Sequence, residues 1–284
     1  MRLLSRLFWS SRPISWINTA FPFAAAYYFS GGSSIWILAI GSIFFLVPYN
    51  VLMYGVNDVF DYESDLRNPR KGGIEGALLE PRYHKATLWW AFGLSLPFAI
   101  ALSFINLVAT FWLWLVLFAV VAYSIKHLRF KERPVLDSLT SALHFVGPMV
   151  VGLSMAEVDF TKGFYPVAIL SFMLWGMASH AFGAVQDVRA DREAKIASIA
   201  TAFGATVTTR LSLIAYAVAG ALAFLLPGRF WQVGLASLPY LFVVGRYWNI
   251  TDQDCERANS GWKKFIWLNF LSGAIVCATL IGPS

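Results

Sequence analysis

The sequence is poor in charged residues, which make up 13% of its 284 positions, and it contains only two cysteines, Cys255 and Cys277. A soluble domain of this length carries about 25% charged residues, so this shortage argues against a single soluble globule. Two cysteines are too few for a disulfide framework. Hydrophobic residues make up 58% of the chain instead, and aromatic residues 17%. The composition therefore indicates an integral membrane protein, which uses lipid as its solvent.

Long hydrophobic runs are abundant, and a helix needs roughly 20 apolar residues to cross the hydrocarbon core. We predict nine transmembrane helices, with a tight turn at Asn106 between the third and the fourth. No soluble domain interrupts the runs, so we expect one transmembrane domain over residues 1–284 and no cleaved signal peptide. The predicted spans are Ile14–Phe29, Ile35–Val56, Ala86–Ile105, Leu107–Ile125, Ser138–Met155, Phe164–Val185, Ala205–Leu226, Phe230–Trp248 and Phe265–Ile281.

The basic residues are distributed unevenly between the two ends of these spans. Of the 22 lysines and arginines, all but Lys162 and Arg229 lie near the ends that share a side with the N-terminus. Short loops rich in lysine and arginine stay in the cytoplasm. We therefore expect a multi-pass cell-membrane protein with a cytoplasmic N-terminus and an external C-terminus. This distribution explains the net charge of +6 without a nucleic-acid partner.

The second predicted span runs directly into an acidic segment, Asn57–Asp65. If the helix continues, Asn57, Asp61 and Asp65 stand four residues apart on one face, and Asp58 flanks that face. Carboxylates at this spacing repel one another, and a divalent cation removes the repulsion. Mg²⁺ prefers oxygen ligands and typically binds one or two carboxylates together with substrate phosphates.

The sixth predicted span ends in a similar acidic pair, Asp187 and Asp191. A single pair of this kind is commonly a solvated helix end. The second and sixth spans run in the same direction, so both motifs are expected at the cytoplasmic face, which suggests a pseudo-repeat. Two such clusters facing one cavity could hold Mg²⁺ ions around a diphosphate. Basic residues near them are candidates to neutralise its remaining charge: Arg67, Arg70, Lys71, Lys126, Arg129, Lys131 and Lys195.

The pattern Asn57-Asp58-x-x-Asp61-x-x-x-Asp65 with Asp187-x-x-x-Asp191 resembles the paired signatures of the UbiA superfamily of intramembrane prenyltransferases. Tyr123-Ser124 followed by Leu128-Arg129-x-Lys131 is similar to a third conserved region of that family. The resemblance covers essentially the whole chain. It implies an all-α bundle of nine transmembrane helices around a central cavity, which binds Mg²⁺ and a prenyl diphosphate. It assigns a metal-binding role to Asn57, Asp58, Asp61, Asp65, Asp187 and Asp191.

Within that superfamily, residues 11–20 and 54–73 are similar to bacterial lycopene elongases. This resemblance implies transfer of a dimethylallyl group from its diphosphate to lycopene, a hydrophobic isoprenoid, on the way to fifty-carbon carotenoids. A downstream carotenoid cyclase is a possible partner. Quinone or aromatic acceptors, haem or chlorophyll prenylation and lipid-ether formation stay open, because they share the diphosphate site. A secondary transporter is the non-enzyme alternative, but its ion sites would lie near the membrane midplane.

The expected chemistry is ionisation of the diphosphate followed by alkylation. Aromatic faces stabilise an allylic cation, and five aromatic residues close to the motifs are candidates: Tyr54, Phe60, Tyr62, Tyr123 and Phe182. Asp65 and Asp191 are candidates for catalytic groups. Polar residues inside spans are functional candidates by default. Accordingly, Asn18, Tyr54, Tyr123, His144 and His180 could line the acceptor cavity, with helix–helix hydrogen bonds as the alternative for the two histidines.

Overall fold

The structure, a computed structural model, describes residues 2–66 and 78–282 and contains helices and turns but no strand over those ranges. The predicted all-α class is therefore confirmed. The helices are α1 (Arg2–Ser10), η1 (Pro13–Ser15), α2 (Ile17–Phe29), α3 (Ile35–Leu46), α4 (Pro48–Phe60), α5 (Tyr62–Asp65), α6 (Pro81–Leu102), α7 (Leu107–Ser124), η2 (Phe130–Glu132), α8 (Leu136–Met155), α9 (Tyr165–Val185), α10 (Val188–Glu193), α11 (Ile199–Phe224), η3 (Gly228–Ala236), α12 (Ser237–Gly245), η4 (Cys255–Ala258), α13 (Asn259–Trp262) and α14 (Phe265–Ile281).

Six helical segments of the described chain are long and apolar enough to cross a membrane, and the bent pair of Cys255–Trp262 with Phe265–Ile281 makes a seventh. A multi-pass protein is thereby supported, whereas the predicted count of nine spans is not confirmed. The two remaining predicted spans correspond to α2, which has 13 residues, and to η3 followed by α12, which have nine residues each. The 13 residues of α2 make a helix of about 20 Å, which is shorter than the hydrocarbon core.

Large apolar side chains cover much of the outer surface of these helices. Leu107 is 87% exposed, Trp36 is 74% exposed and Trp267 is 73% exposed. Soluble monomers rarely expose apolar patches of this extent, whereas lipid solvates such side chains. The surface therefore agrees with the membrane environment that the composition indicated.

Two helix boundaries follow directly from local sequence. The predicted turn between the third and fourth spans is confirmed, because the extended Asn106 caps α7 by accepting a hydrogen bond from the Ala109 amide at 2.7 Å. Proline interrupts the second predicted span, since α3 ends at Leu46 and α4 starts at Pro48. The acidic motif is thus carried by α4, a separate helix of 13 residues.

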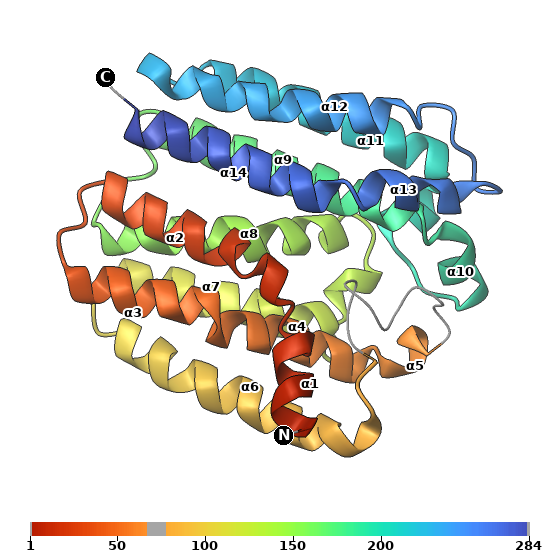
Figure 1. Ribbon diagram of the computed structural model, residues 1–284, viewed down its shortest axis with the longest axis horizontal. Helices are drawn as coiled ribbons and strands as arrows, with labels where there is room; N and C mark the ends of the chain where they lie inside the picture. The colour runs from red at the N-terminus through yellow and green to blue at the C-terminus, as the bar shows by residue number, and fades with distance from the viewer. Residues whose placement is uncertain (1, 67–77, 283–284) are drawn as a thin grey trace. The chain divides into compact units, whose positions relative to one another are not determined.

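The chain divides into two compact units, and α8 contributes to both of them. The first unit comprises Met1–Phe130 and Gly147–Asp159. Its core contains the fully buried rings of Phe23, Phe44 and Tyr49. Within this unit α4 packs against α1, α6 and α7 (Figure 1). These neighbours fix the helix that ends in the first acidic motif.

The second unit comprises Lys131–Val146 and Phe160–Ser284. Here α9 packs along α11, and α11 also contacts α10, α12 and η3 (Figure 1). Phe182 is fully buried against Tyr247 and Phe265, with 5.5 Å between ring centroids in both pairs. Our suggestion that Phe182 stabilises a cation is therefore replaced by a packing role.

Candidate functional site

The first acidic motif spans a helix break rather than a continuous helix. α4 ends at Phe60, Asp61 has φ −101° and ψ −1°, and the chain restarts as the four-residue α5 (Figure 1). The expectation of one continuous helical face from Asn57 to Asp65 is therefore wrong. The torsions of Asp61 lie in the bridge region, which is sparsely populated and common among active-site residues.

Asp58 is tied to the N-terminal segment of the chain. Its side chain is fully buried, Oδ2 accepts a hydrogen bond from Ser10 Oγ at 2.7 Å, and Oδ1 lies 3.3 Å from Arg12 Nη2. The Arg12 guanidinium also lies 4.2 Å from the centre of the Tyr54 ring. Both carboxylate oxygens of Asp58 are thus engaged by protein groups, and one face of Tyr54 already holds a cation.

The region after α7 lies against the same motif. Ser124 Oγ donates a hydrogen bond to Asn57 Oδ1 at 2.9 Å. Arg129 Nη1 donates to the Phe60 carbonyl at 3.4 Å, and Arg129 Nη2 lies 3.8 Å from Asp61 Oδ1. The predicted third region therefore joins the first motif and brings a positive charge to a carboxylate that is only 4% exposed.

The second acidic motif repeats the backbone of the first. α9 ends at Val185, and Asp187 precedes the six-residue α10 with φ −100° and ψ −4°, almost the torsions of Asp61. Asp191 follows on α10, and its amide donates to the Asp187 carbonyl at 2.8 Å. Both residues are half-buried, and the Oδ1 atom of Asp187 is buried. Each motif thus places one aspartate at a helix break and a second four residues later.

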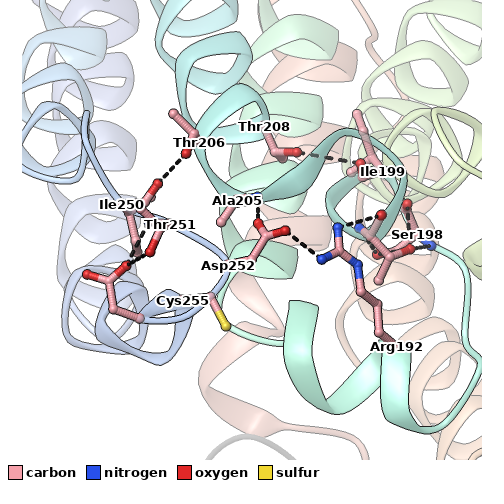
Figure 2. Close-up of polar contacts among 12 residues, drawn as sticks. Arg192, Ser198, Ile199, Ala205, Thr206, Thr208, Ile250, Thr251, Asp252 and Cys255 are labelled. Atoms are coloured by element: carbon pink, nitrogen blue, oxygen red, sulfur yellow. Dashed lines mark hydrogen bonds and ion pairs between the residues drawn. The ribbon is translucent and has the colours of Figure 1, made fainter.

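A polar network beside α10 includes residues that sequence reasoning missed (Figure 2). Arg192 Nη1 lies 2.5 Å from Asp252 Oδ2, and Asp252 Oδ1 accepts a hydrogen bond from the Ala205 amide at 2.6 Å. Arg189 Nη1 lies 3.2 Å from Glu256 Oε1. Asp252 stands 60 residues from Arg192, so no local sequence pattern could have paired them.

Two carboxyl groups in this network are shifted towards ionisation. Partial burial acts to raise the pKa of Asp252, but the hydrogen bonds from Ala205 and Arg192 outweigh it and leave the pKa below its usual value. Hydrogen bonds from the Thr251 side chain and amide, together with Arg257, lower the pKa of Asp254 to about 2. Both groups are therefore anions at neutral pH.

His180, a predicted cavity residue, joins α9 to α8. Its Nδ1 lies 3.0 Å from Ser138 Oγ, and Asp137 Oδ1 accepts from the Ser138 amide at 2.6 Å. Asp137 is fully buried, and its Oδ2 accepts from the Ile199 amide at 2.6 Å, at the start of α11. This arrangement favours the alternative of a helix–helix hydrogen bond for His180. Asp137 is a second acid that the sequence analysis missed.

The remaining predicted residues lie on separate elements. His144 is buried in α8, while Asn18 and Tyr123 are half-buried in α2 and α7. Lys126 and Lys195 are exposed in loops, and Lys131 is half-buried in η2. The Asp65 side chain and the whole of Arg67, Arg70 and Lys71 lie outside the described residues.

A family model described as the UbiA prenyltransferase family matches residues 19–272. The chain belongs to this family. A lycopene elongase/hydratase of Corynebacterium glutamicum is 51% identical over 96% of this chain and 95% of that protein. The C(50) beta-cyclic carotenoids biosynthesis protein LbtBC of Dietzia sp. is 52% identical over 98% of this chain and 64% of that protein. The UbiA resemblance carried by the two motifs is thus confirmed.

A solved structure supports the UbiA fold independently. The UbiA homolog from Archaeoglobus fulgidus bound to GPP and Mg²⁺ aligns with a TM-score of 0.67 and covers 95% of this chain and 99% of that chain. Its sequence identity is 18%, so this likeness concerns the fold. Fold, motifs and family agree, and the protein is a multi-pass membrane prenyltransferase.

The donor atoms of the two motifs suit the metal that UbiA prenyltransferases are expected to use. Aspartate and asparagine offer only oxygen ligands, as hard cations prefer. Within the described ranges, no group of three or more His, Cys, Asp or Glu side chains is placed to hold a metal. Mg²⁺ commonly takes one or two carboxylates and completes its shell with water and substrate phosphate. The motifs therefore fit Mg²⁺ in combination with a diphosphate.

Proposed function

We propose that this UbiA prenyltransferase transfers dimethylallyl groups from their diphosphate to the ends of lycopene in fifty-carbon carotenoid synthesis. The observation that supports it most is the identity of 51% to a lycopene elongase/hydratase along 96% of the chain. A match of that length necessarily includes both acidic motifs, because they lie far from either end of the chain. We propose that the whole chain acts as one prenyltransferase domain.

The proposed reaction begins with cleavage of the donor. The C1–O bond of dimethylallyl diphosphate breaks heterolytically, and its electron pair leaves with the diphosphate. Bound Mg²⁺ supplies positive charge that stabilises this leaving group. Asp61 and Asp187, with Asn57, Asp65 and Asp191, are the proposed metal ligands. Arg129 adds a fixed guanidinium beside Asp61, where it can contact phosphate oxygens in a bidentate manner.

The remaining proposed diphosphate contacts come from other basic side chains near the motifs, and the lysines among them act as point charges. They are Arg67, Arg70, Lys71, Lys126, Lys131 and Lys195.

The allylic cation then reacts with the acceptor. The terminal double bond of lycopene attacks C1 and leaves a tertiary cation, which loses a proton or takes up water and then loses a proton. Water must stay out until the carbon–carbon bond has formed. Tyr123 and Phe60 remain proposed aromatic walls, with Asn18 and His144 as proposed cavity groups. Asp65 is the proposed proton acceptor.

We propose a topology of nine crossings with the N-terminus and both acidic motifs in the cytoplasm and the C-terminus outside. The concentration of lysine and arginine on one side of the predicted spans supports this orientation. Reporter domains fused to either terminus of the full chain test it. A C-terminal reporter active only in the cytoplasm would contradict the proposal.

We further propose that the elongated carotenoid is the substrate of a cyclase. The chain covers 64% of the Dietzia protein, whose name assigns it to cyclic fifty-carbon carotenoids. Coexpression with a carotenoid cyclase should convert the elongated product into a cyclic one of the same carbon number. Acyclic product alone, with an active cyclase present, would contradict this.

The direct test of the main proposal is expression in a bacterial host that accumulates lycopene. Pigments heavier by one or two five-carbon units are expected, and an added hydroxyl would identify hydration as the fate of the final cation. The control is Asp187→Ala expressed to the same level, which should leave lycopene unchanged. Unchanged lycopene with the wild-type chain would contradict elongation and favour a quinone acceptor.

A further inference from the structure

An ion pair fills a break in α11 (Figure 2). Gly204 has φ 80° and ψ 161°, and α11 is helical on both sides of it. In a continuous helix the Ala205 amide would donate to the Thr201 carbonyl four residues earlier. Here the Ala205 amide donates to Asp252 Oδ1 at 2.6 Å, and the Thr201 carbonyl accepts from Arg192 Nη2 at 3.1 Å. Because Arg192 and Asp252 are themselves paired, they replace the missing helical hydrogen bond.

Glycine is required at this break. The positive φ of Gly204 is strained for any residue with a side chain. An added Cβ would also stand 3.2 Å from Asp252 Oδ1. Gly204 thus leaves room for the carboxylate that caps the second part of α11.

The same ion pair holds α10 along one side. We call residues 250–259 the brace segment. Arg192 contacts Asp252, and Arg189 contacts both Glu256 and the Gln253 carbonyl. At the head of α10, Gln186 accepts from Asn259 Nδ2 at 2.6 Å. Arg189 and Arg192 stand three residues apart in α10, as expected for one side of a helix.

The aspartates occupy the other side of α10. At 3.6 residues per turn, the midpoint of Asp187 and Asp191 lies roughly 150° from the midpoint of Arg189 and Arg192 around the helix axis, while the neighbours Asp191 and Arg192 are about 100° apart. The printed contacts of the brace segment with α10 are made by the arginines and not by the aspartates. Arg189 and Arg192 pair with Glu256 and Asp252, two carboxylates of the brace segment.

α10 cannot maintain this orientation by itself. It has six residues, and isolated helices shorter than about 12 residues are marginal in water. Its two aspartates, four residues apart, repel each other as well. The contacts of α10 with α11 and with the brace segment therefore supply the order that the sequence of α10 lacks.

We propose that Arg192 and Asp252 are positioning residues that hold α10 so that Asp187 and Asp191 present their carboxylates to Mg²⁺ and the diphosphate. This inference rests on the proposed function of those aspartates. The break in α11 makes this possible, because it leaves the Ala205 amide and the Thr201 carbonyl free of each other to bond to the ion pair. Order in α10 and metal affinity should then be coupled.

Amide hydrogen exchange on the metal-free full chain tests the brace without any activity. Arg192→Gln and Asp252→Asn should each speed exchange over residues 188–194 about tenfold, the loss expected for a hydrogen bond between charged groups. Asp254→Asn is the matched control, because Asp254 lies in the same segment and pairs with Arg257 but has no contact with α10 in the described structure. Unchanged exchange in the first two variants would overturn the proposal.

Titration with Mg²⁺ tests the positioning role. Arg192→Gln and Asp252→Asn should raise the half-saturating Mg²⁺ concentration and the KM for dimethylallyl diphosphate about tenfold, the usual cost of losing an outer-shell partner. The KM for lycopene should stay the same, and Arg192→Lys should recover part of the loss. The double variant should be little worse than either single one, because the two residues act as a pair.

Two outcomes separate this inference from the proposed function. In one outcome, amide exchange rises in the Arg192 and Asp252 variants but their half-saturating Mg²⁺ concentration does not, while Asp187→Ala still disturbs the response to Mg²⁺. The positioning role is then wrong, and the metal role of Asp187 stands. If Asp187→Ala keeps a normal Mg²⁺ requirement, the proposed function of that aspartate fails, and the inference fails with it.

Discussion

Asp61 in the first unit and Asp187 in the second have almost the same backbone, with φ −101° and ψ −1° against φ −100° and ψ −4°. A short helix follows in each case, of four residues in α5 and six in α10. The supports are unlike. Ser10, Arg12 and Arg129 surround the first motif, whereas a C-terminal segment braces the second. The comparison teaches that a repeated backbone turn can be held by unrelated partners, so the repeat is visible in acid spacing and torsions only.

The strongest test of this comparison is to remove the equivalent aspartates. Asp61→Ala and Asp187→Ala should each lower kcat/KM for the prenyl diphosphate by at least about 100-fold, more than the loss of an outer-shell partner. Single-turnover assays over a Mg²⁺ series measure the effect, and Asp191→Ala should behave similarly. Full activity in one of the two would show that the motifs are not functionally equivalent.

Asp58 has no acidic counterpart, because Ala184 stands three residues before Asp187. Asp58→Ala should destabilise the protein by about 3–5 kcal/mol, since it breaks a buried ion pair with Arg12. Thermal or denaturant unfolding in detergent measures this loss. The double variant Arg12→Leu/Asp58→Leu should lose less than the sum of the single ones. A raised Mg²⁺ requirement with unchanged unfolding would instead support the metal role that the sequence assigned to Asp58.

Gly204 belongs to the support of the second motif alone. Gly204→Ala should cost about 1–3 kcal/mol, because alanine is strained at positive φ and crowds Asp252. Gly273→Ala in α14 is the control, since a Cβ there meets nothing within 4 Å. That variant should be neutral or slightly stabilising. Equal unfolding temperatures for the two variants would argue against a strained break.

The smallest predicted effect is the dependence of the unfolding temperature on pH below about pH 4. The folded-state pKa of Asp254 is about 2, below its ordinary 3.8, so the ionised carboxylate is favoured by folding. Its stabilisation is complete above about pH 4 and is lost as the pH falls through the folded value. The unfolding temperature of the wild type should exceed that of Asp254→Asn at pH 6, and the difference should shrink towards pH 2. A constant difference would show that ionisation of Asp254 does not contribute to the stability of the protein.

The sequence by itself determined the class of the protein and the chemistry of its motifs. Scarce charge and long apolar runs require lipid, and the spacing of Asp61 with Asp65 and of Asp187 with Asp191 indicates a metal and a diphosphate. The turn at Asn106 was also predicted, because the cap depends on neighbours in the chain. These features depend on residues close together in the chain, so they can be predicted from composition and residue spacing.

Only the tertiary structure decided what holds the motifs. The helix break at Asp61, the capture of Asp58 by Ser10 and Arg12, and the pairing of Arg192 with Asp252 each depend on partners distant in sequence. Helix periodicity cannot reveal them, because it reports which residues share a face and not what packs against that face. Buried polar groups take whichever partner the fold brings within hydrogen-bonding distance, and that choice is made by packing.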